Sequence, residues 1–172
     1  MRRLFTLALI ATGIFTGLNA NAQDDKSKRP SPPAKVSASL SSGAEISIDY
    51  SRPSIKNRPL ESLAPAGKVW RTGANEATTF EVNKDVTING KVLKAGKYGL
   101  YSIPGEKEWT IIFNKKSNLW GSNGYSEADD ALRITAVPEK ASSMTEKMTF
   151  NVDNGGKVKL AWSDVAVNFT VE

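Results

Sequence analysis

Polar side chains that could bind a ligand are concentrated between residues 70 and 76, where Trp70-Arg71 is followed closely by Asn75-Glu76. Arg71 offers a planar fork of donors to a carboxylate, a phosphate or a pair of sugar hydroxyls. Asn75 can both donate and accept hydrogen bonds, and an ionised Glu76 accepts them. Trp70 adds a flat face for stacking. This mixture predicts a site for a small polar ligand such as a carbohydrate.

A second polar segment, residues 114–130, contains Trp120 and Tyr125 among glycines and asparagines. Aromatic side chains in such a loop are typical of a platform on which a sugar stacks. Arg52, in the irregular stretch after residue 49, is a third side chain that could donate hydrogen bonds to a ligand. The predicted ligand-binding residues are Arg52, Trp70, Arg71, Asn75, Glu76, Trp120 and Tyr125.

Each of these residues also has a purely structural interpretation. Arg71 and Glu76 could form an ion pair across a tight turn that Gly73 permits, with Trp70 in the core. Trp120 could fold back and plug one end of the domain, because a large aromatic side chain usually buries most of its surface. The sequence leaves both alternatives open.

The acidic side chains Glu127, Asp129 and Asp130 are hard oxygen ligands of the kind that calcium prefers, but their spacing is not that of an EF-hand loop. A solvated acidic loop is the simpler interpretation, and no metal site is predicted.

The chain contains no histidine and no cysteine. Nucleophilic systems of the Ser-His-Asp or Cys-His type are therefore excluded, as are zinc and copper sites built on imidazole or thiolate. A hydrolase would need two carboxylates roughly 5 to 10 Å apart. Glu76 is the alternative catalytic candidate, with Asp49 or Asp129 as its partner; no catalytic residue and no cofactor is predicted.

Alternation of apolar and polar residues dominates the chain from Lys35 onward and predicts short β-strands. Asn89-Gly90 is a strong signal for a tight hairpin, because a type I′ turn needs two residues with positive φ. The expected strands are Val36–Leu40, Ile46–Ile48, Thr78–Val82, Val86–Ile88, Lys91–Leu93, Tyr98–Ile103, Trp109–Phe113, Leu132–Val137, Met148–Val152, and a final hairpin that turns at Ser163-Asp164. The prediction is an all-β, single-domain antiparallel β-sandwich or jelly-roll-like barrel over residues 35–172.

One expected strand is apolar on both faces, since Trp109, Ile111 and Phe113 alternate with Ile112. A strand of this kind belongs in the middle of a sheet that is covered on both sides.

The first 22 residues have the features of a signal peptide: Arg2 and Arg3, an apolar run from Leu4 to Phe15, and a small-x-small pattern at Ala20-Asn21-Ala22. We expect cleavage before Gln23, no membrane span afterwards, and a periplasmic or secreted protein. Residues 23–34 are rich in charge, serine and proline, which predicts a flexible leader.

Basic residues outnumber acidic ones by 23 to 18, and by 21 to 18 once the two arginines of the signal peptide are gone. The remaining basic residues are scattered among acidic ones. A clustered positive face for a phosphate backbone is not visible, so no binding to nucleic acid is expected.

Several ordered blocks carry a resemblance to a known family: YSRPS, GKVWRTGANEATTF, LKAGKYGLYSIPG, EWTIIFNK and the Trp120-Gly121 pair. The chain resembles, from Lys35 to Glu172, the domain-of-unknown-function family numbered 2911. The resemblance implies an exported protein of the kind typical of Bacteroidota and a β-rich fold, and it implies no activity or catalytic residue. The residues themselves favour a non-catalytic binding module for a small polar ligand. There are two alternatives: a structural role in the cell envelope, through protein partners there, or a carboxylate hydrolase that works without histidine.

Overall fold

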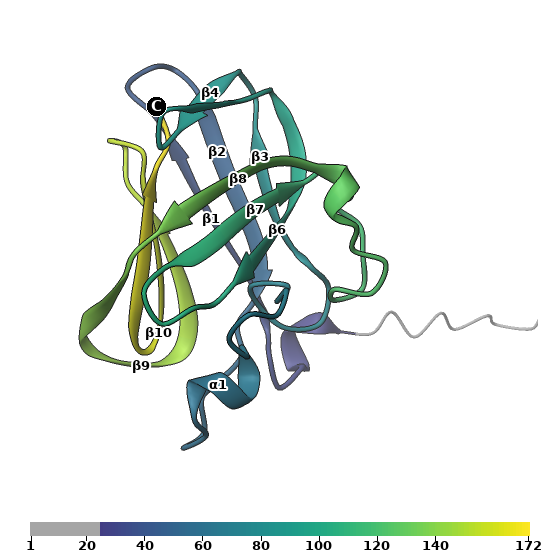
Figure 1. The fold of residues 1–172 in the computed structure, drawn as a ribbon, viewed down its shortest axis with the longest axis vertical. Coiled ribbons are helices and arrows are strands. Elements are labelled where there is room, and N and C mark those ends of the chain that lie inside the picture. The colour runs from purple at the N-terminus through teal and green to yellow at the C-terminus, as the bar shows by residue number, and fades with distance from the viewer. Residues whose placement is uncertain (1–24) are drawn as a thin grey trace, which may run out of the picture.

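The computed structural model describes residues 25–172, which form two packed layers of antiparallel strands (Figure 1). The predicted signal peptide and its cleavage site lie outside the described residues. The elements in chain order are η1 (Lys26–Lys28), β1 (Pro33–Ser39), β2 (Glu45–Ser51), α1 (Leu60–Leu63), β3 (Thr78–Val82), β4 (Val86–Ile88), β5 (Lys91–Leu93), β6 (Gly96–Ile103), β7 (Trp109–Asn114), η2 (Glu127–Asp129), β8 (Asp130–Ala136), β9 (Pro138–Val152) and β10 (Lys157–Thr170).

The larger layer is a six-stranded sheet in the order β1-β2-β3-β6-β7-β8. The second layer is built on the paired strands β9 and β10, and the end of the chain joins this pair to the β4–β5 hairpin through a bridge between Ile88 and Val171. The sheets are not closed into a barrel. The all-β sandwich is therefore confirmed, and the barrel alternative is wrong.

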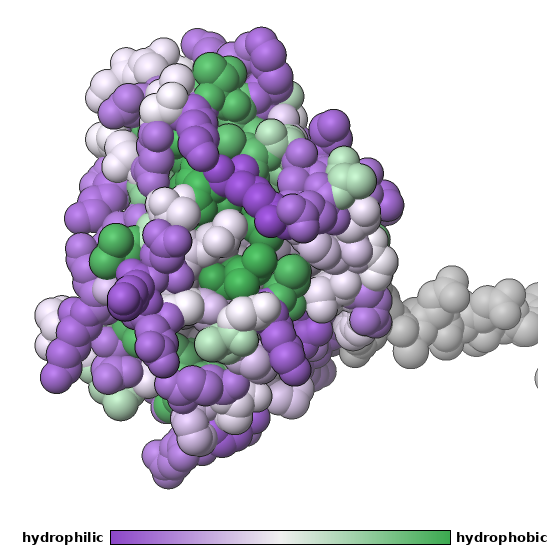
Figure 2. Space-filling view, in the orientation of Figure 1, coloured by the Kyte–Doolittle hydropathy of each residue, from purple (hydrophilic) through white to green (hydrophobic). Residues whose placement is uncertain are grey.

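The core lies between the two layers, where the inward side chains of the strands meet. Phe80 of β3 and Phe113 of β7 pack edge to face with ring centroids 5.0 Å apart, and Phe169 of β10 lies 5.9 Å from Phe113. On the face shown in Figure 2, polar residues cover most of the periphery and apolar ones reach the surface in the middle.

A second, smaller apolar cluster lies on the outer face of the six-stranded sheet. Tyr101 and Ile112 have no exposed surface there, and Leu119 and Tyr125 pack over them from the loop between β7 and β8. The loop thus covers the face of β7 that the core does not, which confirms that β7 is buried on both sides.

Two strands differ from the expectation. β10 runs without reversal from Lys157 to Thr170, so the predicted turn at Ser163-Asp164 is wrong. Ser163 has φ 56°, and the pairing of β10 with β9 shifts on both sides of it. A β-bulge absorbs the positive φ there without turning the chain.

β9 begins at Pro138, ten residues before the expected Met148. The Asn89-Gly90 turn is confirmed, with φ 47° and 76°.

The described part of the leader is placed against the domain. Asp25 caps the short helix η1 by accepting from the backbone N–H of Ser27 at 3.1 Å, and β1 already begins at Pro33. The backbone N–H of Arg52 donates to the carbonyl of Pro32 at 2.9 Å. These polar contacts place residues 25–34 against the sandwich, and the flexibility expected from their composition stays a prediction.

Within residues 25–172, no helix has both the length and the apolar character needed to cross a membrane.

Candidate functional site

Glu76 is bound by two basic residues of the leader. Lys26 Nζ lies 2.9 Å from Glu76 Oε1, and Arg29 Nη1 donates to both carboxylate oxygens at 3.1 Å. The hydrogen bond from Lys26, together with that from Arg29, lowers the pKa of Glu76 from 4.5 to about 2. The carboxylate is therefore ionised at neutral pH.

Arg71 does not pair with Glu76 in the described chain. Its Nε donates to the carbonyl of Gly73 at 3.3 Å, and its guanidinium packs against Gly121, where an added Cβ would stand 2.5 Å from Nη1. Gly121 adopts a positive φ of 65°, a conformation that favours glycine, and the end of the Arg71 side chain lies beside it. The alternative ion pair across the turn is wrong.

Trp70 is a core residue, as its structural interpretation predicted. Its ring stacks on Trp162 with centroids 5.6 Å apart and planes 12° from parallel, and Trp109 packs edge-on at 6.2 Å. Only 8% of Trp70 is exposed. Trp70 therefore offers no open face to a polar ligand.

Arg52 and Asn75 serve as tethers between segments of the chain. Arg52 donates to the carbonyl of Met148 at 3.0 Å and to the hydroxyl of Thr149 at 2.7 Å, which ties the end of β2 to β9. Asn75 Nδ2 donates to the carbonyl of Ser31 at 3.0 Å and so anchors the leader.

Tyr125 forms a polar cluster with β8. Its hydroxyl donates to Asp130 at 2.8 Å and accepts from Arg133 at 2.8 Å. Burial, and then the bond to Asp130, raise the pKa of this phenol to about 12. The ring packs 5.1 Å from Tyr101, so the residue closes the outer apolar cluster.

The acidic loop is neutralised by cations of the chain. Asp129 pairs with Lys116 at 2.7 Å, Asp130 with Arg133 at 2.6 Å, and Glu127 with Arg133 at 3.0 Å. Arg133 thus binds two of the three carboxylates, and among residues 25–172 no group of acidic side chains is arranged to hold a metal ion.

Trp120 is the one predicted aromatic residue that stays open to solvent, with 57% of its surface exposed. The alternative in which it plugs the end of the sandwich is wrong. Its backbone forms an isolated bridge with Glu76, so the two segments chosen from the sequence do lie side by side.

A pocket of about 500 Å³ lies on the outer face of the six-stranded sheet, beside Glu76. Strands β1, β2, β3 and β6 contribute residues to it, residues 117–119 form one wall, and Lys26 of the leader contributes to another. The charged lining residues are Lys26, Asp49, Glu76 and Lys97. Of the seven predicted binding residues, only Glu76 lines this pocket. Of the two carboxylates predicted as catalytic partners of Glu76, Asp49 lines this pocket and Asp129 does not.

Thr79 is one of the lining residues that sequence reasoning missed. It lies on β3 between Asp49 of β2 and Gly99 of β6 in the register of the sheet. Thr79 is only 9% exposed, and its hydroxyl has no hydrogen-bond partner among residues 25–172. The sequence gives only a weak indication of this role. Thr79 is a polar residue at an outward position of a central strand, and whether it is buried depends on a loop that is distant in sequence.

The wall beside Thr79 depends on Gly99. A Cβ on Gly99 would stand 2.6 Å from the carbonyl oxygen of Lys116 and 2.7 Å from the ring of Tyr101. The loop after β7 can therefore lie directly on the sheet only because residue 99 is glycine.

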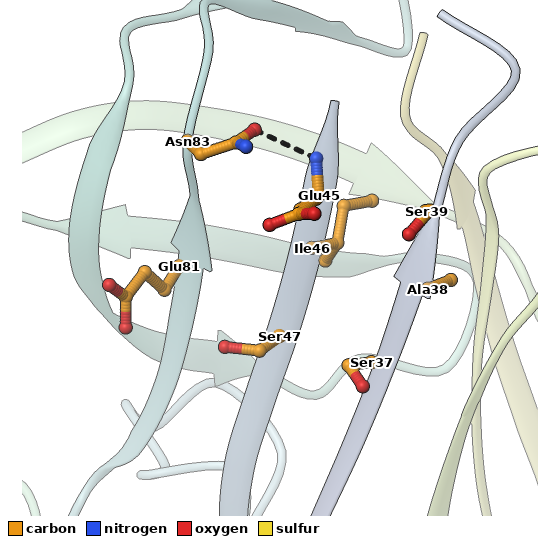
Figure 3. A pocket seen from close by; sticks show the side chains of 8 residues that line it. All are labelled: Ser37, Ala38, Ser39, Glu45, Ile46, Ser47, Glu81 and Asn83. Carbon is orange, nitrogen blue, oxygen red and sulfur yellow. Dashed lines mark hydrogen bonds between the residues drawn. The ribbon is translucent and has the colours of Figure 1, made fainter. Parts of the chain in front are cut away.

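A second hollow of about 400 Å³ lies on β1, β2 and β3 (Figure 3). Ser37, Ser47, Glu45 and Glu81 line it, and Asn83 Oδ1 accepts from the backbone N–H of Glu45 at 2.8 Å. Lys97, which lines the larger pocket, forms an ion pair with Glu81 of the hollow at 3.4 Å. This pair joins the rims of the two depressions.

No curated protein and no solved structure is found to be similar to this chain. One family model, described as protein of unknown function (DUF2911), matches residues 31–171, from the end of the leader through almost all of the sandwich. The match includes Glu76, Thr79 and the loop that walls the pocket, and it leaves out Lys26 and Arg29. The chain therefore belongs to the DUF2911 family of proteins of unknown function.

Proposed function

We propose that this protein is a non-catalytic binding module that holds a small polar ligand, such as a carbohydrate, in the pocket beside Glu76. One observation carries the proposal: a pocket of about 500 Å³ is lined by Thr79, whose hydroxyl has no partner in the described chain. A buried polar group without a hydrogen bond is costly, and a ligand hydroxyl that bonds to it, once the lining side chains move to admit it, would remove that cost.

The charges around the pocket favour a ligand that both donates and accepts hydrogen bonds. Lys26 and Lys97 supply donors, whereas Asp49 and Glu76 supply acceptors. Ala77 and Leu119 add apolar surface on which the carbon face of a sugar ring can rest. A ligand with a single strong charge would meet repulsion from one of the two pairs.

A carboxylate hydrolase is the second candidate, because Glu76 and Asp49 line the same pocket. Its mechanism needs one carboxylic acid that holds a proton near the working pH. Glu76, with its pKa lowered to about 2, cannot supply that proton. Binding without turnover fits these groups better.

We place the module in the periplasm or outside the cell, on the basis of the amino-terminal signal sequence alone. An envelope role through protein partners is the other non-catalytic alternative, and it predicts no saturable binding of small molecules.

The test is a titration of the isotopically labelled protein with mono- and disaccharides, followed by amide chemical shifts. We expect saturable shifts at residues 76–79 and 117–119. Thr79→Val keeps the shape of the side chain and removes the hydroxyl, so it should weaken binding by about tenfold, the value of one hydrogen bond to a buried group. Ser47→Ala, in the neighbouring hollow, is the matched control and should change nothing.

Equal binding by wild type and Thr79→Val would overturn the assignment of the pocket, and the absence of any saturable shift would overturn the proposed ligand class. Turnover of a glycoside that Glu76→Gln abolishes would show instead that the protein is a hydrolase.

A further inference from the structure

A different opening lies at the end of the sandwich near α1, which is at the bottom of Figure 1. It has a volume of about 210 Å³, and most of its lining is apolar. The lining includes Leu60, Ala64, Pro104, Trp109, Pro138 and Val165. None of the residues that line the polar pocket contributes to it.

A smaller cavity of about 10 Å³ adjoins this opening, since Leu60, Trp109 and Val165 line both. Trp70 and Trp162 complete its walls, so three tryptophans surround the inner cavity. Its volume is about that needed to hold one water molecule. Together, the two spaces form an apolar opening, called the mouth below, with a narrow inner cavity.

Trp162 leaves a donor unused at the inner end. It is 3% exposed, and its indole N–H has no hydrogen-bond partner in the part of the chain that the structure describes. An indole N–H lies in the plane of the ring, and Trp70 covers a face of that ring in a nearly parallel stack. The π-system of Trp70 is therefore in the wrong place to accept from it.

The placement of Trp162 follows from the β-bulge in β10. The pairing with β9 shifts between Ala161 and Ser163, and Trp162 is the residue inside that shift. Bulges redirect single side chains and are frequent beside binding sites. Trp162 thus lies within the irregular part of the strand, and its indole N–H meets no acceptor among residues 25–172.

Charge at the mouth restricts the ligand further. Glu61 and Glu106 line it, and no lysine or arginine does so among the described residues. Two carboxylates disfavour an anion, so a fatty acid or a similar carboxylate is a poor match.

We propose that this end of the sandwich binds a small, neutral, largely apolar molecule that carries one hydrogen-bond acceptor, with the acceptor bound to the indole N–H of Trp162. An apolar cavity of about 150 Å³ is enough to hold benzene, so the opening has room for an aromatic ring with a short substituent. The site is independent of the polar pocket, and either proposal can fail without the other.

Three probes of nearly equal size separate the elements of this proposal. Acetophenone has a ring and a carbonyl acceptor, α-methylstyrene has the same shape without the acceptor, and benzoate has acceptors with a negative charge. Each is titrated into the intact protein, and the indole N–H resonances are followed by NMR.

We expect acetophenone to move the Trp162 indole resonance and to bind about tenfold more tightly than α-methylstyrene, which is the contribution of one hydrogen bond to a buried donor. Benzoate should bind more weakly than acetophenone. Trp162→Phe keeps an aromatic ring but has no N–H, and it should make the two neutral probes bind equally.

Ala66→Leu places a larger side chain at the exposed rim of the opening and should weaken both neutral probes. Ala131→Leu, an exposed alanine on β8 that does not line the opening, is its matched control. Equal affinity of acetophenone and α-methylstyrene for the wild type would overturn the role of Trp162. Unchanged binding by Ala66→Leu would overturn the location of the site.

Discussion

Arg29 donates to both carboxylate oxygens of Glu76 at 3.1 Å, although the two residues are 47 positions apart in the chain. This contact ties the leader to the rim of the proposed polar pocket. Lys26 binds the same carboxylate, so the leader contributes one of the walls of the pocket. A segment with the composition of a linker is thus part of the candidate site.

The Glu76 contact should make stability depend on pH in one direction. Its pKa falls from 4.5 to about 2 on folding, so the contact stabilises the protein above pH 4.5, and its contribution disappears as the pH drops toward about 2. Glu76→Gln should lower the free energy of unfolding by only about 1 kcal/mol near neutral pH, because 39% of the side chain is exposed and solvent screens the charges. Urea denaturation of the wild type and of Glu76→Gln across this pH range measures the difference in their free energies of unfolding. A difference that does not change with pH would contradict the prediction.

Thr79→Val should stabilise the protein by about 1 kcal/mol, because it removes a buried hydroxyl that has no partner among the described residues. Valine also suits a β-strand as well as threonine does. The expected rise in melting temperature separates a binding defect of this variant from a folding defect. A fall in stability would show that the hydroxyl is hydrogen-bonded in solution, by water or by the chain.

Gly99→Ala should destabilise the domain by about 2 kcal/mol or more, because the added methyl group overlaps the Lys116 carbonyl and the Tyr101 ring. Gly90→Ala is a useful comparison, since its Cβ would meet nothing within 4 Å and only the positive φ of 76° opposes it. That backbone cost is about 1 kcal/mol. Equal losses in chemical denaturation would mean that the loop does not lie on Gly99.

Asn75→Ala should destabilise the protein by about 1 kcal/mol more than Asn75→Gly does. Both variants lose the hydrogen bond to Ser31, but only alanine must adopt the left-handed conformation with a Cβ, since φ is 58° at this position. Thermal denaturation of the pair separates the two effects. A glycine variant as unstable as the alanine variant would place the whole effect in the side-chain hydrogen bond.

Tyr125→Phe should lower stability by about 1 kcal/mol through its lost hydrogen bonds to Asp130 and Arg133, and it should leave ligand binding in the polar pocket unchanged. Absorbance titration of the phenolate should also lose a step near pH 12, because that is where Tyr125 ionises. Weaker sugar binding by this variant would restore Tyr125 as a ligand contact.

Local patterns in the sequence were sufficient to predict the strands and the class of the fold. Alternation places Phe80 and Phe113 in one core, and Asn89-Gly90 encodes its turn through positive φ, so each prediction depends on only a few neighbouring residues. The same approach failed at Ser163, where a residue with positive φ makes a bulge in β10 instead of a turn. Both outcomes use the same backbone conformation, and only pairing with β9 decides between them.

The sequence by itself determined the absence of imidazole and thiol chemistry, the two-faced burial of β7 and the segments that contain Glu76 and Trp120. The tertiary structure decided where the side chains of those segments lie: Trp70 packs in the core, Arg71 packs beside Gly121, and Glu76 lines the pocket and binds Arg29. Hydrogen-bond partners far apart in sequence set these orientations, because a buried polar group takes whichever partner the fold brings within reach. Thr79 shows the same dependence, since burial by the loop after β7 is what leaves its hydroxyl without a partner in the described chain.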